Sequence, residues 1–344
     1  MRRRLTGWPA HLAPHLLFLI PELLMAAGPL VVAMSTDASG KRRFRMPDFF
    51  YGGQALIEGV MMRGRTTVAM SVRPPSGEIV TISEPLPPAL SADRRLMRTP
   101  LLRGVFLLYE TLVIGTRMLM RSASLAAEGE DVELGKGMIA GTMVVSIGFA
   151  IGLFFLLPLF LSTFAEDATN SDFAANAVEG VIRLGIFIGY IVVIGLMNDI
   201  RRVFAYHGAE HKAISAYEAD RPLTPDEVDA FGTAHTRCGT TFLLIVVVIS
   251  IFFFSLIPRA GVPLPLLFLS RIVLVPVIAA VAYELVRFGA RHYGNRLVRA
   301  LYSPGLWLQS LTTRPPDRSM LEVSIASLES CLASDREAAA TAKA

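Results

Sequence analysis

One segment of the chain brings together three histidines and a cysteine, residue types that bind metal ions. It contains His207-Gly-Ala-Glu210-His211 and ends with His235-Thr-Arg-Cys238. His207 and His211 are four residues apart, so on a helix both imidazoles project from one face and can share a metal ion. Glu210 lies between them, in a position to act as a general base on water at that metal. Glu210 is therefore the candidate catalytic residue.

The order H-x-x-E-H is the reverse of H-E-x-x-H and matches the inverzincin pattern. His235 and Cys238 are three residues apart, so both can point to one side and supply a third or fourth ligand. Imidazole and thiolate suit zinc. The expected zinc ligands are His207, His211, His235 and Cys238. If all four bind one ion, the site is structural, because a catalytic zinc keeps an open coordination position.

Two simpler interpretations stay open for the same residues. Histidines on an interfacial helix could contact lipid phosphates or carboxylates, and Cys238 could be a small buried side chain, which is the common role of a free cysteine. The chain has two cysteines in all. That number is too small for a disulfide framework and is typical of a reducing compartment.

The elements that must position these residues are membrane helices. The chain has 344 residues, of which 53% are hydrophobic and 18% charged, against about 25% charged in an average soluble protein. A spanning helix needs about 20 mostly apolar residues. Four runs satisfy this, at roughly 138–163, 179–198, 241–258 and 265–287. The sequence therefore predicts a mainly α-helical, polytopic membrane protein and excludes a disordered chain.

Basic residues in the loops predict the orientation. Loop 164–178 has no Lys or Arg, whereas loop 199–240 has Arg201, Arg202, Lys212, Arg221 and Arg237. Cytoplasmic loops carry the excess of Lys and Arg. We therefore expect the cell inner (cytoplasmic) membrane, with both termini and loop 199–240 on the cytoplasmic side. The net charge of +4, without a basic and aromatic stripe, predicts no nucleic-acid binding.

The remaining segments divide the chain further. Residues 66–73 and 78–84 alternate in polarity and are joined by a four-residue turn, which predicts a small cytoplasmic β-hairpin. In 101–120, Arg103, Glu110 and Arg117 form one stripe on an apolar helix, which we interpret as interfacial or protein-facing, with a membrane span as the alternative.

The sequence therefore divides the chain into four parts: a variable N-terminal extension (1–48) with an ambiguous apolar stretch at 13–34; the hairpin with its amphipathic helix (49–130); a transmembrane bundle (131–303); and a cytoplasmic C-terminal tail (304–344).

Charged residues fall inside two of the predicted spans. Glu179 and Arg183 are four residues apart, so an ion pair along one helix face is expected. Arg271 lies deeper in its span, and either pairs across helices or extends its guanidinium towards the outer face.

Four motifs in order resemble the bacterial DUF1385 family. They are FYGGQALIEGVMMRG (50–64), FAYHGAEHKAISAYE (204–218), HTRCGTTF (235–242) and PGLWLQSLTTRPPD (304–317). The resemblance covers about residues 49–330 and implies a multi-pass membrane protein, of a group described as metal-dependent enzymes with no established reaction. It also implies that the five candidate site residues, together with Glu58 and Arg63, lie in family motifs. Residues 1–48 lie outside it, and 319–329 depart from the family pattern.

The leading hypothesis is a zinc-dependent hydrolase in the membrane. Its substrate is left open among a membrane protein, a peptide and a lipid-linked molecule. The alternative is a non-catalytic scaffold or assembly factor whose metal ties loop 199–240 to the N-terminal hairpin. A transporter is less well supported, because the predicted spans hold few ionisable residues and no internal repeat. The lipid bilayer is the expected partner, and a homo-oligomer is compatible with the sequence.

Overall fold

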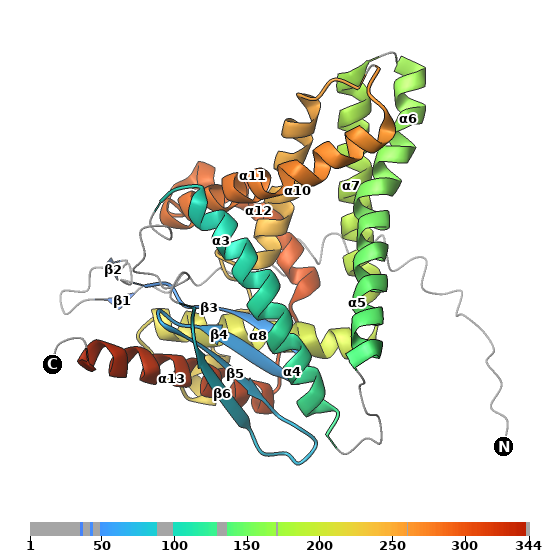
Figure 1. Cartoon of the computed structure of the whole chain (residues 1–344). Helices are drawn as coiled ribbons and strands as arrows, with labels where there is room; N and C mark the ends of the chain where they lie inside the picture. The colour runs from blue at the N-terminus through green and yellow to red at the C-terminus, as the bar shows by residue number, and fades with distance from the viewer. Residues whose placement is uncertain are drawn as a thin grey trace, which may run out of the picture. The chain divides into compact units, whose positions relative to one another are not determined.

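The computed structural model describes residues 35–36, 42–43, 49–87, 99–128, 136–169, 171–259 and 261–341 (Figure 1). All of them belong to a unit that spans Ala33–Ala344. The apolar stretch at 13–34, whose role the sequence left open, lies outside the described residues. The first described elements are two short antiparallel strands, β1 (Ser35–Thr36) and β2 (Arg42–Arg43).

A four-stranded antiparallel sheet follows, with its strands in chain order. It consists of β3 (Gly52–Leu56), β4 (Gly59–Arg63), β5 (Thr67–Val72) and β6 (Val80–Pro85). The predicted hairpin is confirmed as β5–β6, and in its turn the Gly77 N–H donates to the Pro74 carbonyl at 2.9 Å. The sequence analysis missed β3 and β4. β3 begins with two glycines, and glycine is depleted in strands, so propensity gave little sign of it.

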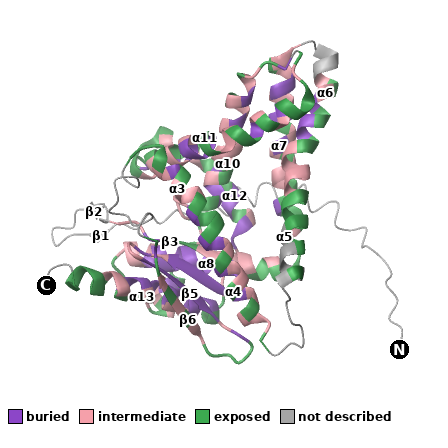
Figure 2. Ribbon diagram, viewed as in Figure 1, coloured by how far each residue is buried: buried purple, intermediate pink, exposed green. Residues whose placement is uncertain are grey.

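Helices cover both faces of this sheet. On one face lie α8 (Asn198–Glu218) and α13 (Arg318–Thr341); on the other lie the π-helical turn η2 (Thr111–Gly115) and α4 (Thr116–Ala126). Met62 packs towards α8 and α13, whereas its neighbour Met61 packs towards η2 and α4. Burial on both faces explains why every residue of β5 is buried (Figure 2).

Three helices are long and apolar enough to cross a membrane. They lie at Val144–Ala165, Asp172–Ile194 and Leu264–Arg291. The first belongs to a continuous helical run of α5 (Lys136–Ile151), η3 (Gly152–Leu156) and α6 (Leu157–Thr169); the others are α7 and α11. The fourth predicted span forms α10 (Gly239–Ser255), an apolar helix of 17 residues. Three of the four runs thus support a membrane location by length and composition.

The predicted amphipathic helix forms α3 (Leu102–Glu110), which continues through η2 into α4. Each residue of its charged stripe contacts an opposite charge on another element. Arg103 Nε donates to Glu284 of α11 at 2.7 Å, and Glu110 accepts from Arg63 of β4 at 2.9 Å. Arg117 lies 4.0 Å from Glu84 of β6. Arg103 and Glu110 therefore face protein, whereas the Arg117 side chain is largely exposed. Two further helices, α9 (Pro225–Asp229) and α12 (Arg296–Thr312), flank the candidate site.

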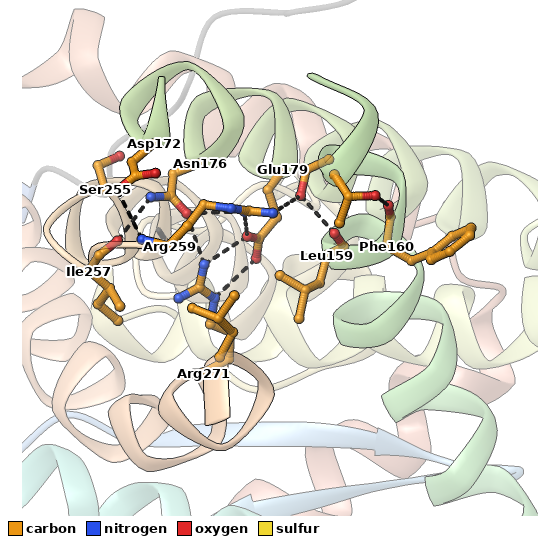
Figure 3. A network of polar contacts seen from close by, with 12 residues as sticks. Leu159, Phe160, Asp172, Asn176, Glu179, Ser255, Ile257, Arg259 and Arg271 are labelled. Atoms are coloured by element: carbon orange, nitrogen blue, oxygen red, sulfur yellow. Dashed lines mark hydrogen bonds and ion pairs between the residues drawn. The ribbon is translucent and has the colours of Figure 1, made fainter. Parts of the chain in front are cut away.

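A buried polar network joins the apolar helices around Glu179 of α7 (Figure 3). Its carboxylate accepts from Arg183 Nη2 at 2.5 Å, which confirms the pair expected from their spacing. It also accepts from Arg271 Nη2 at 2.8 Å and from Arg259 Nη1 at 3.1 Å, so Arg271 pairs across helices. Asn176 accepts from both of these arginines as well. The network ties α7 to α11 and to the segment before α11.

Candidate metal centre

Helix α8 carries His207, Glu210 and His211 and is held against the sheet by small side chains. Ala205, Ala209 and Ala213 recur every four residues, and all three are buried in the core between α8, α13 and the sheet. Residues spaced by four share one helix face. The face that bears the two histidines therefore lies beside the packed face, towards the start of α10 and the end of α12.

Three predicted ligands converge at this point. The side-chain donor atoms of His207, His211 and Cys238 all lie within 4.8 Å of one another. His207 Nε2 is 3.3 Å from Cys238 Sγ, and the two imidazole centroids are 4.4 Å apart. Cys238 is the N-cap of α10, and its Sγ accepts from the Thr240 N–H at 3.3 Å. The cluster therefore lies at the very start of an apolar helix.

Backbone carbonyls orient both imidazoles. His207 Nδ1 lies 2.9 Å from the carbonyl oxygen of Thr312, and His211 Nδ1 lies 2.5 Å from that of Thr233. A carbonyl oxygen only accepts, so each Nδ1 carries the hydrogen, and a neutral ring then presents an unprotonated Nε2. Metal-binding histidines are commonly held by a carbonyl in this way. The donor set of two imidazoles and one thiolate thus fits a zinc ion.

Charge within the cluster changes the pKa of two of its members. Burial alone would lower the pKa of His211, but the Cys238 thiolate and Glu210 outweigh it and raise that pKa to about 9. Burial alone would raise the pKa of Cys238, yet the two neighbouring imidazoles hold it well below its ordinary value. Without a metal, the cluster is therefore a thiolate paired with an imidazolium. Binding a cation would displace the imidazolium proton.

Glu210 stands beside the free nitrogens of both histidines. Its Oε2 lies 3.9 Å from His207 Nε2 and 3.8 Å from His211 Nε2, and the side chain is 6% exposed. On its other side Glu210 packs against the backbone of β3. A Cβ built on Gly53 would lie 2.9 Å from Glu210 Cγ and 2.5 Å from the Met61 carbonyl oxygen, so this approach requires glycine.

His235 lies next to the cluster but outside the group of three. Its ring centroid is 5.6 Å from that of His211, and its Nε2 faces Glu218 Oε2 at 3.5 Å. The backbone of His235 is held by Gln309 of α12, which accepts from its N–H at 2.9 Å and donates to its carbonyl at 2.8 Å. Its role as a metal ligand stays a prediction.

The sequence analysis did not single out the groups that support the ligands. These are the carbonyls of Thr233 and Thr312 and the side chain of Gln309. The last two belong to the motif at 304–317, which carried the resemblance to a family but contains no histidine or cysteine. Backbone carbonyls leave no signature in a sequence, so that motif was the sole available signal.

Comparison with known proteins agrees with the motifs. The model of a family described as "Protein of unknown function (DUF1385)" matches residues 99–334. A protein of Bacillus subtilis (strain 168), named "Uncharacterized protein YqhQ", is 32% identical over 297 residues, which cover 82% of this chain and 92% of that protein. No solved structure matches the chain. The chain belongs to the DUF1385 family.

Proposed function

We propose that this protein is a multi-pass membrane protein with a zinc-dependent hydrolytic centre formed by His207, His211, Cys238 and Glu210. One observation carries the proposal: three good zinc ligands lie within 4.8 Å of one another, with a carboxylate beside the two imidazole Nε2 atoms. Three protein ligands are the number found in catalytic zinc sites, whereas structural sites have four.

Each residue has a distinct task in this proposal. The two imidazole Nε2 atoms and the Cys238 thiolate would hold the ion, and the carbonyls of Thr233 and Thr312 keep the rings in the required tautomer. A bound zinc ion supplies Lewis acidity at its open position. Glu210 would accept the proton of the attacking water at its carboxylate and return it to the leaving group.

We also propose that α10 is a fourth span and that the centre faces the cytoplasm, with both termini on that side. The arginine-rich loop 199–240 and the arginine-free loop 164–178 support this orientation. Because Cys238 caps α10, the zinc would then lie at the membrane surface. We also propose that the chain divides into four parts, with boundaries at residues 48, 130 and 303. In this division the sheet belongs to the second part (49–130), and α8 and α13 cover one of its faces.

Metal analysis of the detergent-purified protein tests the proposal. We expect about one zinc per chain in the wild type and none in His207→Ala or Cys238→Ala. Glu210→Gln should keep its zinc and lose hydrolysis, because Gln cannot accept the proton. A folded wild-type protein that holds no zinc after purification with the metal present would refute the proposal.

A structural zinc in a membrane scaffold is the second candidate. Burial favours it: His211 is 2% exposed and Cys238 is 4% exposed. The groups around the cluster also tie the segment before α10 to α12. In this case Glu210→Gln keeps full function in cells, whereas His207→Ala removes the protein from the membrane. The Glu210 variant therefore separates the two candidates.

A further inference from the structure

We infer that the outer edge of β3 binds an extended peptide segment, and that polypeptide is the substrate class of the metal centre. This inference rests on the proposed hydrolytic function. It is carried by the placement of β3 along the helix that bears the ligands.

β3 is the first strand of the sheet, so among the described residues one of its edges has no neighbouring strand. Within the part of the chain that the structure describes, no hydrogen bond joins the backbone of Gly52–Leu56 to any element other than β4. An unpaired strand edge presents alternating N–H and C=O groups and is a ready template for another chain. Extended peptides use such edges by adding a strand.

Contacts at three points show that this edge strand runs antiparallel to α8. At its start, the Tyr51 ring lies 5.3 Å from the ring of Tyr217, near the end of α8. At its middle, Gly53 contacts Glu210. Beyond its end, Glu58 accepts from Arg202 Nε, near the start of α8, at 2.7 Å. The strand therefore passes directly beside the candidate base.

The start of β3 also lies close to the ligand loop. The guanidinium of Arg237, the residue before Cys238, lies 4.3 Å from the centre of the Phe50 ring. A strand added to the open edge would lie about 4.8 Å from β3. Its backbone would then run near Glu210, which approaches β3 at Gly53. Of the two histidine ligands beside Glu210, His207 has the more exposed side chain, at 17%.

The chemistry of the edge favours a peptide over a lipid. Backbone N–H and C=O groups alternate along a peptide with the same period as along β3, so the two can pair repeatedly. A lipid offers no such row of donors and acceptors. The peptide bonds of the added strand are also the bonds that a zinc centre with a general base hydrolyses: water adds to the carbonyl carbon, the C–N bond breaks, and the amine takes the proton from Glu210.

Photo-crosslinking tests the inference with an unfolded protein as the probe. The full-length Glu210→Gln protein, loaded with zinc in detergent, is incubated with casein after replacing Gly52 by p-benzoylphenylalanine. Gly52 suits this change, because a Cβ there meets nothing within 4 Å. The matched control carries the same residue at Thr81, an exposed position on β6 at the opposite edge. We expect casein to be captured at position 52 and not at position 81.

Cleavage by the zinc-loaded wild type separates this inference from the proposed function. Casein hydrolysis with no capture at 52, or with equal capture at 81, would overturn β3 as the binding edge and leave the hydrolase in place. Hydrolysis of phosphatidylglycerol vesicles but not of casein would overturn the peptide as substrate class. Capture at 52 with no hydrolysis of either probe would support the edge and overturn the hydrolase. A zinc-loaded protein that neither captures nor cleaves casein would overturn both.

Discussion

The buried carboxylate of Glu179 gives the sharpest test of the packing among the apolar helices. It accepts hydrogen bonds from Arg183, Arg259 and Arg271, and the Glu179 side chain is 1% exposed. Replacing it by Gln removes the negative charge and leaves the three guanidinium groups buried with less compensation. Removing one partner of a buried ion pair costs about 3–5 kcal/mol.

The structure refines this magnitude in both directions. The side chains of Arg259 and Arg271 are 0% exposed, so water cannot replace the lost carboxylate. However, Asn176 still accepts from both of them, at 3.3 and 2.9 Å, and a Gln at position 179 keeps one acceptor oxygen. We therefore expect Glu179→Gln to lower the free energy of unfolding by about 3 kcal/mol, the lower end of that range.

The assay is unfolding of the detergent-purified protein by increasing SDS, followed by circular dichroism. Glu179→Gln/Arg271→Met should recover at least about 1 kcal/mol over Glu179→Gln, because it removes one unpaired buried charge from the same network. Glu84→Gln is the matched control: its exposed pair with Arg121 should contribute less than about 1 kcal/mol. A Glu179→Gln protein as stable as the control, or a double variant less stable than Glu179→Gln, would refute the reasoning.

Three further predictions concern the metal centre. Gln309→Leu removes the amide that holds the His235 backbone and should weaken zinc affinity about 10- to 100-fold. Competition with a chelator measures this affinity, and an unchanged value would mean that the loop containing His235 is positioned without Gln309. Because the pKa of His211 is raised to about 9, the His211 proton must leave when zinc binds. Zinc affinity should therefore rise about tenfold per pH unit up to pH 9 and then level off. Calorimetry in buffers of different ionisation enthalpy should detect the released proton, and an affinity that does not change with pH would contradict the role of His211 as a zinc ligand. Gly53→Ala should destabilise the protein by about 1–3 kcal/mol, because its Cβ would lie 2.5 Å from the Met61 carbonyl oxygen of β4 and 2.9 Å from Glu210 Cγ of α8. Gly52→Ala should have no such effect, and equal effects of the two changes in thermal unfolding would argue against the close packing of β4 and α8 around Gly53.

Several features of this protein could be predicted from the sequence because they depend on residues near one another in the chain. The i,i+4 spacing placed His207 and His211 on one helix face and paired Glu179 with Arg183. The apolar runs predicted the long helices, and alternation with a turn predicted the β5–β6 hairpin. Helical and strand periodicity act over a few residues, so local patterns determine them.

Contacts between distant segments were decided by the tertiary structure alone. The position of α8 against β3 and the end of α12 brings the Thr312 carbonyl to His207 across 105 residues, and His235 faces Glu218. The same packing makes β3 an edge strand beside Glu210. Among the apolar helices, it gathers two more arginines onto Glu179, from 80 and 92 residues away. Such neighbours depend on how whole elements pack, and no spacing in the sequence records that arrangement.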